Sequence, residues 1–271
     1  MKLSYEFYPP KNLDFQKIVN EFLLMEKYAP RFVSITYGAM GGSQEKSEGL
    51  IRAFRENTDV DIVAHLTLAG KSRAELTEII HKFKLLGVNK IVALRGDSLE
   101  EKFKAHPEGF FNTAEFVKFL KEFGLEVYVS AYPEPHPESE GFDFDLNLLR
   151  EKTLAGSRQC ISQFCFSIKN YRELIDGISK REIKNDLTAG IMPIYNIRSL
   201  CNMATKCGIN IPSEIIEQFS EDQEQNERAA VKICIKQIKD LQNMGINNFH
   251  FYTLNQSSLM LKILDELSLT E

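Results

Sequence analysis

Several side chains that can move protons stand at or near the ends of short apolar runs. Glu6 is the one acid in the run Ser-Tyr-Glu-Phe-Tyr-Pro-Pro, where aromatic neighbours would disfavour the charged form of a carboxyl group. A carboxyl group that keeps its proton near neutral pH is suited to general acid catalysis. The alternative interpretation is a glutamate that is turned to solvent or paired with a lysine.

Asp97 and two histidines are further candidates. Asp97 follows the apolar run Ile-Val-Ala-Leu and Gly96, which would let the backbone come close to a ligand, although Asp97 could equally cap a helix. His65 and His136 could each bind a cofactor or fill the core through a hydrogen bond. Because the two histidines lack metal-site spacing and a carboxylate partner, we predict no metal.

Two glycine patterns bear on phosphate binding. Gly38, Gly41 and Gly42 form a turn whose backbone amides could meet a phosphate or only shape a loop. Gly-Lys-Ser at 70–72 is similar to the end of a P-loop, but His65 stands where the first glycine of that motif belongs. The sequence therefore predicts no P-loop.

The elements that must position these side chains alternate between strand and helix. Each of eight runs rich in β-branched and aromatic residues is followed by a segment of helical periodicity. The predicted strands are Lys2–Tyr8, Arg31–Tyr37, Asp61–Leu68, Lys90–Arg95, Glu126–Tyr132, Gln159–Cys165, Thr188–Ile194 and Asn248–Leu254.

Helix-end signals support this alternation. Ser72 with Glu75, and Asn112 with Glu115, have the spacing of capping boxes, while glycines at 87 and 124 follow the last apolar positions as helix stops. One apolar helix face is predicted to contain Phe15, Ile18, Val19, Phe22 and Leu23. Between the seventh and eighth strands we expect extra helix, the second helix there opening at Pro212 and the third running to about Gly245.

Eight such units predict a parallel sheet closed into a (β/α)8 TIM barrel, with residues 1–271 forming one domain. An open Rossmann sheet is the second choice, because Pro9 and Pro10 follow the first strand where GxGxxG would be needed. In a barrel, the carboxyl ends of the strands form the active site.

Bulk composition excludes some functions. A hydrophobic share of 43% and a net charge of −5 indicate a globular chain with no basic surface for nucleic acid. No apolar run has membrane-spanning length, and the first ten residues carry no signal-peptide core, so we expect a cytoplasmic protein. The five cysteines lack metal-site spacing and are expected to be reduced thiols.

Taken together, the strand-end segments resemble the methylenetetrahydrofolate reductase family over nearly the whole chain, in order, at seven of the eight strands. The matching segments are Tyr5–Pro10, Val33–Ala39, Ala64–Thr67, Ile91–Asp97, Ala131–Glu134 with His136–Glu138, Ile161–Phe164, and Phe249–Asn255.

The resemblance implies an FAD-dependent enzyme of the short bacterial type. NADH or NADPH would reduce the flavin and leave, and methylenetetrahydrofolate would then bind in the same place, which is a ping-pong cycle. Glu6 would protonate folate N5 as the methylene bridge opens, and hydride from the flavin would complete the methyl group. Asp97 would orient folate and tune the flavin.

The resemblance also implies binding residues. Gln163 and Tyr252 would contact the substrate, and Arg95 and Lys152 would meet anionic groups of the cofactor. The FAD-binding set is Thr36, Tyr37, Ala39, His65, Arg95, Gly96, Asp97, Tyr132, His136, Asp145 and Lys152. We further expect a homo-oligomer with small-molecule substrates.

Three positions depart from the family pattern. Ile197 replaces an aromatic residue that stacks on the substrate, Gln256 replaces an arginine that helps to bind folate, and Glu151 stands where a second basic residue is common. The first two motivate an alternative function, a folate- and flavin-binding subunit that depends on a partner electron carrier. A different flavin barrel, such as a proline dehydrogenase, is a more distant alternative.

Overall fold

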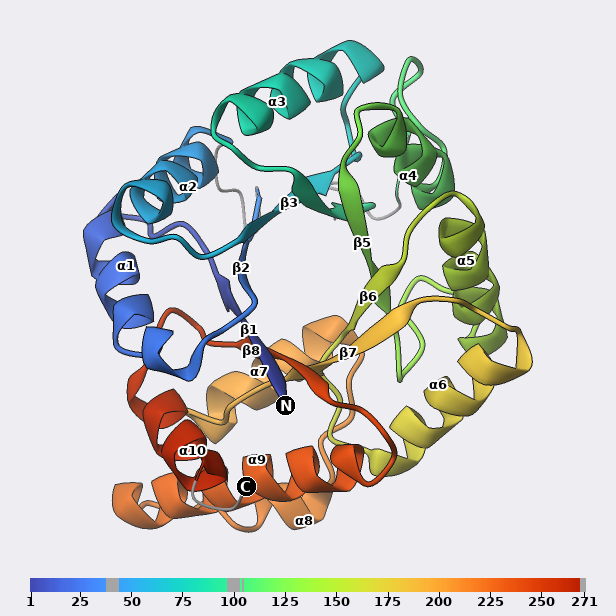
Figure 1. The fold of residues 1–271 in the computed structure, drawn as a ribbon. Helices are drawn as coiled ribbons and strands as arrows, with labels where there is room; N and C mark the ends of the chain where they lie inside the picture. Colours follow the sequence, from blue (N-terminus) through green and yellow to red (C-terminus); the bar gives the residue numbers. More distant parts are fainter. Residues whose placement is uncertain (38–43, 97–102, 104, 269–271) are drawn as a thin grey trace.

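The chain forms a closed barrel of eight parallel strands surrounded by helices (Figure 1). The computed structural model describes residues 1–37, 44–96, 103 and 105–268. Neighbours in the sequence are neighbours in the barrel, and β1 pairs with β8 from Lys2 opposite Asn248 to Glu6 opposite Tyr252. The predicted barrel is confirmed, and the open Rossmann alternative is wrong because this last pairing closes the sheet.

The eight predicted strands are confirmed, but each is shorter than predicted, and the seventh begins at Asp186, two residues before the predicted Thr188. Their bounds are β1 Lys2–Phe7, β2 Phe32–Ile35, β3 Ile62–Thr67, β4 Lys90–Leu94, β5 Glu126–Ala131, β6 Gln159–Ser162, β7 Asp186–Ile191 and β8 Asn248–Tyr252. The residues trimmed from the carboxyl ends, such as Tyr37, Arg95 and Tyr132, belong to the loops that surround the mouth of the barrel.

The helices cover the outside of the barrel. They are α1 Phe15–Leu23, η1 Glu26–Tyr28, α2 Gln44–Asn57, α3 Arg73–Leu85, α4 Thr113–Glu122, α5 Phe142–Leu154, α6 Ile168–Lys180, α7 Ile197–Cys207, α8 Ser213–Ile216, α9 Gln223–Gln242 and α10 Ser258–Ser268. The capping box at Ser72 and Glu75 forms in full. At Asn112 the side chain caps Glu115 N–H, but Glu115 accepts a hydrogen bond from Phe111 N–H instead of closing the box.

Helix α1 shows one deviation from its predicted face. Ile18, Val19 and Phe22 are buried against the barrel as expected, whereas Leu23 is 38% exposed. Leu23 is the last residue of the helix, where the apolar stripe has rotated away from the sheet.

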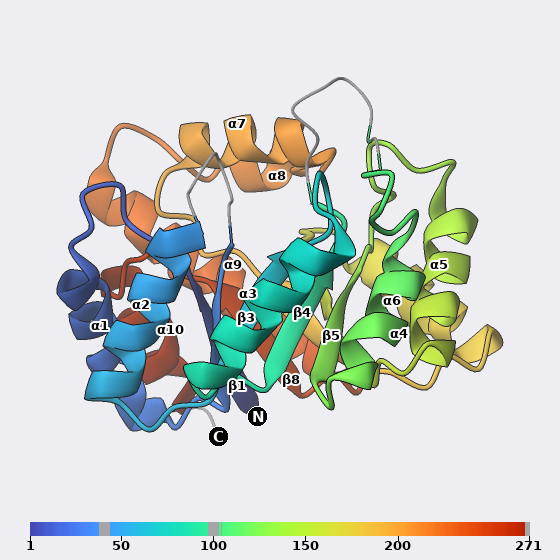
Figure 2. The ribbon, with the colours of Figure 1, turned by 90° about the horizontal axis from the view of Figure 1, so that it is seen from above.

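The segment between β7 and β8 carries the expected additional helices. Pro212 precedes the single turn of α8, and α9 ends shortly before Gly245, whose φ is +88°. Figure 2 shows α7 and α8 at the end of the barrel toward which the strands run. This excursion therefore lies beside the mouth, where a barrel protein binds its ligands.

The interior of the barrel is layered. Alternate residues of each strand point inward, and an apolar layer of Phe32, Val63, Val92, Tyr128 and Ile161 fills the lower part. Above this layer the inward positions become polar on β1, β2, β3 and β8. Side chains thus fill the barrel interior. The inward-facing polar positions of β1, β2, β3 and β8 form a layer below the mouth, which we call the polar floor.

Candidate active site

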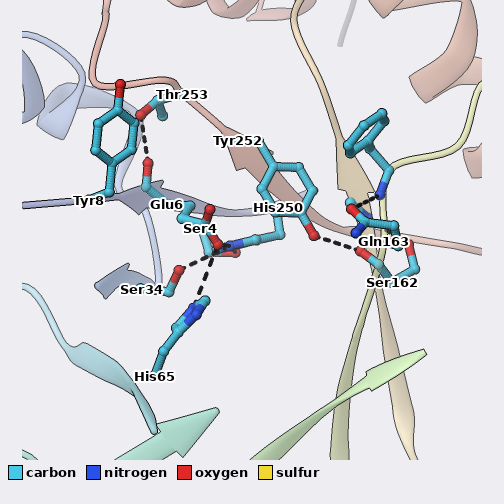
Figure 3. Close-up of polar contacts among 12 residues, drawn as sticks. Ser4, Glu6, Tyr8, Ser34, His65, Ser162, Gln163, His250, Tyr252 and Thr253 are labelled. Carbon is cyan, nitrogen blue, oxygen red and sulfur yellow. Dashed lines mark hydrogen bonds and ion pairs between the residues drawn. The ribbon is translucent and has the colours of Figure 1, made fainter. Parts of the chain in front are cut away.

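Glu6 lies on the polar floor between two histidines from different strands (Figure 3). Its Oε2 is 3.6 Å from Nε2 of His65 on β3 and 3.9 Å from Nε2 of His250 on β8. The carboxyl side chain is 19% exposed. Among the described residues, no lysine or arginine lies within ion-pair distance of it, which rules out the predicted alternative of a lysine pair there.

The surroundings of Glu6 differ from the predicted aromatic walls. Tyr5 and Phe7 are fully buried, but they point outward and pack against helical residues, with ring centroids 6.5 Å apart for Tyr5–Phe22 and 5.5 Å apart for Phe7–Phe54. The prediction that these neighbours surround the carboxyl group is wrong because side chains alternate across a strand. Imidazoles from neighbouring strands take that place.

His250 is held in one orientation by two serines. Its Nδ1 lies 2.8 Å from Ser4 Oγ, and its Nε2 lies 3.2 Å from Ser34 Oγ. Ser4 Oγ also donates to the carbonyl of Phe249 at 3.3 Å, which ties this serine to the strand that carries His250. The Nε2 side of the ring therefore faces both the Ser34 hydroxyl and the carboxyl group of Glu6.

His65 is the second imidazole beside Glu6. Burial lowers its pKa, and the nearby Glu6 carboxylate offsets only part of that effect. Its Nε2 is buried and has no hydrogen-bond partner within the described part of the chain. The Nε2 atom of a neutral His65 could therefore form a hydrogen bond with a bound ligand next to Glu6.

The predicted substrate residues lie on the β6–β8 side of the mouth. Tyr252 donates a hydrogen bond of 2.8 Å to the carbonyl of Ser162, the residue before Gln163 (Figure 3). Gln163 Oε1 accepts from the N–H of Phe164 at 3.0 Å. A Cβ added to Gly190 would lie 2.8 Å from the Tyr252 ring and 2.2 Å from the Ser162 carbonyl oxygen, so the ring needs a glycine beneath it.

Two cations meet on the β4–β5 side. Lys152 on α5 is 3% exposed, and its pKa is lowered to about 8, mainly by burial, which Asp145 opposes and the Arg95 guanidinium reinforces. Arg95 Nη2 pairs with Glu138 Oε2 at 2.9 Å, and Asp145 Oδ2 accepts from the N–H of His136 at 2.9 Å. A buried ammonium near a second cation is a favourable place for an anionic group.

The remaining predicted cofactor residues that the structure describes lie in the loops after the strands, and their side chains differ in the contacts that they make. Thr36 is buried at the end of β2, and its Oγ1 finds no hydrogen-bond partner among the residues described. Tyr37 packs its ring edge-on against Phe83 of α3, 6.0 Å between centroids. The Tyr132 and His136 rings are also in edge contact, at 5.3 Å.

Gly96 reaches φ +87° at the end of β4, where a Cβ would lie 2.8 Å from Cβ of Thr67. This close approach explains the glycine. Asp97 and Ala39 lie outside the described residues, as does the glycine turn at 38, 41 and 42.

The sequence reasoning did not assign a role to Ser4, Ser34 or His250. Their signal is the period of two along a strand: Ser4 shares the face of Glu6, and His250 shares the face of Tyr252. The pairing of β1 with β8, which brings His250 to Glu6, could not be read from either strand alone.

Other classes of site receive no support from the described residues. In residues 1–37, 44–96, 103 and 105–268, no three His, Cys, Asp or Glu side chains are grouped to hold a metal ion. All five cysteines are free. Within the same ranges, no helix has both the length and the apolar character needed to cross a membrane.

Fold and site together define a (β/α)8-barrel protein whose mouth combines an acid–imidazole cluster on one side with buried cations on the other. The sequence profile described as methylenetetrahydrofolate reductase matches residues 1–268. The chain belongs to the methylenetetrahydrofolate reductase family.

Relatives of similar length support this membership. The 5,10-methylenetetrahydrofolate reductase of Pectobacterium carotovorum is 33% identical over 264 residues, which cover 96% of this chain and 87% of the relative. The enzyme of the same name from Escherichia coli K12 is 30% identical over 96% of this chain and 88% of its own.

Solved structures of lower identity share the fold. A dihydropteroate synthase of Xanthomonas albilineans aligns with a TM-score of 0.54 at 14% identity, covering 99% of this chain and 91% of that one. A mutant tryptophan synthase α-subunit from Pyrococcus furiosus aligns with a TM-score of 0.51 at 16% identity, covering 86% and 96%. These two likenesses concern the barrel alone.

Proposed function

We propose that this chain reduces 5,10-methylenetetrahydrofolate to 5-methyltetrahydrofolate, with FAD as cofactor and NADH or NADPH as reductant. Family membership and the relatives' shared name support the reaction. Bound FAD would accept hydride from the nicotinamide and pass it to the folate. The chain's own part is to hold these ligands at the mouth and to supply a proton.

The proposed cofactor side is the β2–β5 half of the mouth. Lys152 and Arg95 would hold the diphosphate of FAD, and Asp145 would keep Lys152 charged. The buried Thr36 hydroxyl and the His65 Nε2, both without a partner among the described residues, fit a group with hydrogen-bonding atoms. Tyr37, Ala39, Gly96, Tyr132 and His136 belong to the same proposed set.

The proposed substrate side is the β6–β8 half. Gln163 would contact the folate and the nicotinamide, and Tyr252 would form the wall between Gln163 and Glu6. Asp97 would face the pterin and flavin. The methylene carbon stays on N5 when the bridge opens, so the proton from Glu6 would go to the departing N10 of the folate and not to N5 as first expected.

The observation that carries the proposal is the environment of Glu6. Among the described residues, the ion-pair partners of this carboxyl group are two imidazoles, and no lysine or arginine pairs with it. His65 is neutral because of its burial. The site thus places an acid that no cation pairs with beside imidazoles, a combination suited to general acid–base catalysis.

The first experiment asks whether the purified chain takes up FAD and transfers electrons. We expect a flavin absorption spectrum, bleaching by NADH or NADPH without air, and recovery of the oxidised spectrum on adding methylenetetrahydrofolate. Failure to bind FAD would contradict the proposal. A chain that binds FAD yet is bleached only after an electron carrier protein is added would instead be a partner-dependent subunit.

The second experiment separates the two half-reactions with Glu6→Gln. The amide keeps the shape but lacks the acidic proton, so folate reduction should fall by at least about 100-fold, as for loss of a general acid. Flavin reduction by the nicotinamide should stay within about twofold of wild type, since that step does not use the acid. Glu122→Gln, on the exposed face of α4, is the matched control. Equal loss in both half-reactions would refute the assigned role.

Three further expectations from the sequence stay predictions. They are that residues 1–271 act as one catalytic domain, that the protein works in the cytoplasm, and that it forms a homo-oligomer.

A further inference from the structure

We infer that Lys71 binds the diphosphate of the FAD, adding to the cofactor side a cation that the resemblance did not assign. The inference rests on the proposed function, because it needs a dinucleotide at the mouth. It also uses a residue of the Gly-Lys-Ser segment that has no P-loop around it.

The backbone holds Lys71 in a defined place after β3. Its N–H donates to the carbonyl of Leu68 at 3.2 Å, and Gly70 has φ +68°, as in a type II turn. A Cβ on Gly109 would lie 2.6 Å from the Lys71 carbonyl oxygen, so the segment before α4 packs closely over this turn. This turn follows β3 directly, and the Lys71 side chain reaches back to Thr67, the last residue of that strand.

The ammonium of Lys71 lies among neutral groups. Its Nζ is 3.3 Å from Thr67 Oγ1, 3.4 Å from the Ala69 carbonyl oxygen and 5.5 Å from the centre of the Tyr37 ring. Of these partners, Thr67 lies against Gly96. Lys71 thus stands between two residues of the proposed FAD set, Tyr37 after β2 and Gly96 after β4.

The positive charge of Lys71 is only partly compensated by nearby negative charge, so an anion could bind beside it. Glu75 attracts the ammonium, but its Oε2 already accepts from the Ser72 N–H at 2.7 Å and from the Ser72 hydroxyl at 2.8 Å. Burial has the larger effect and lowers the pKa of Lys71. A half-buried cation that the described carboxylates compensate incompletely gains most from a ligand that brings negative charge.

The position of Lys71 indicates which anion it meets. Strand β3 lies between β2 and β4, on the cofactor half, whereas Gln163 and Tyr252 stand on the opposite half. The nucleotides proposed to bind here carry diphosphates, and a lysine acts on a phosphate as a point charge. We assign the FAD diphosphate and not the nicotinamide diphosphate, because Lys71 lies between Tyr37 and Gly96, both of the proposed FAD set.

The test compares FAD with riboflavin, which has the same ring system and no phosphate. With flavin-free protein, Lys71→Met should weaken FAD binding by about tenfold, the size expected for one charge-assisted hydrogen bond. Riboflavin binding should not change, and Lys71→Arg should recover most of the FAD affinity. Lys82→Met, on the exposed face of α3, controls for the loss of one positive charge.

Each other outcome overturns the inference. Equal weakening of FAD and riboflavin would place Lys71 at the ring system or in the fold. Unchanged FAD affinity with a raised KM for NADH or NADPH would assign it to the nicotinamide nucleotide. If wild type binds no FAD, the proposed function fails together with the inference. If wild type and Lys71→Met bind FAD equally, only the inference fails.

Discussion

We expect the buried ammonium of Lys152 to make the affinity for FAD depend on pH. Its pKa of about 8 lies below the ordinary lysine value, so the flavin-free protein loses this charge as the pH rises through 8. A bound diphosphate favours the charged form. We therefore expect the dissociation constant of FAD to be flat between pH 6.5 and 7.5 and to increase above pH 8, by at most about tenfold per pH unit for one proton.

The measurement is a fluorescence titration of FAD at each pH, repeated with Lys152→Met. The variant should bind FAD more weakly at pH 7 and show a shallower rise above pH 8. An affinity that improves from pH 7 to pH 9 in wild type would contradict the role given to Lys152.

At the level of residues, the sequence located much of the candidate site but not its contacts. Glu6, His65 and Tyr252 do come together, since all three lie at strand ends of one barrel. The aromatic surroundings predicted for Glu6 are wrong because Tyr5 and Phe7 point to the helices. The register between strands that are distant in the sequence decides which histidine contacts Glu6. No local sequence pattern predicts that register.

At the level of elements, the close packing of β6, β7 and β8 requires that Gly190 has no side chain. Gly190 has an ordinary φ, yet a Cβ there would lie 2.2 Å from the Ser162 carbonyl oxygen and 2.8 Å from the Tyr252 ring. Gly190→Ala should therefore lower the free energy of unfolding by about 3 kcal/mol, as overpacking does. It should also raise the KM for folate, because the Tyr252 wall must move.

Gly124→Ala provides the contrast for this prediction. That glycine has open space around it but φ +72°, so the cost there is only backbone strain, about 1 kcal/mol. Urea unfolding measures both variants. If Gly190→Ala is no more destabilising than Gly124→Ala, the packing argument is wrong.

The bounds of the elements were predicted well where strong local signals exist. The capping box of Ser72 and the left-handed glycines at 87 and 124 mark helix ends because their chemistry is local. The strands were predicted too long at their carboxyl ends, since apolar residues there continue into loops that pack on the barrel. Ile194, for example, is buried although β7 ends at Ile191.

At the level of the whole molecule, closure depends on the contact between the ends of β1 and β8. Asn255 bonds both backbone groups of Tyr8, accepting from its N–H at 3.0 Å and donating to its carbonyl at 2.8 Å, and it does so with φ +59°. Asn255→Ala should cost about 2–4 kcal/mol, from two lost hydrogen bonds and the left-handed backbone.

Asn255→Gly separates these two contributions, because glycine accepts the backbone conformation but makes neither bond. We expect its stability to lie between wild type and Asn255→Ala in urea unfolding. Wild-type stability in both variants would show that the closure does not depend on this side chain.

The overall architecture was the most predictable level. Eight regular alternations leave few topologies once crossovers must be right-handed, and a closed barrel is the simplest of them. The resemblance to the reductase family then identified the strand ends, and family membership confirms it. The arrangement of α7 and α8 beside the mouth could not be predicted, because it depends on contacts such as Gly208 with Pro137 that join distant segments.

Because Glu6 is contributed by the first strand and His250 by the last, the acid–imidazole cluster joins residues from almost the full length of the polypeptide. During translation, Glu6 is synthesised among the first residues, whereas His250 is added only near the end. This cluster therefore cannot form until synthesis is almost finished. The same delay leaves the edge of β1 without its final neighbour during elongation, so this edge is the place where a chaperone would protect the growing barrel.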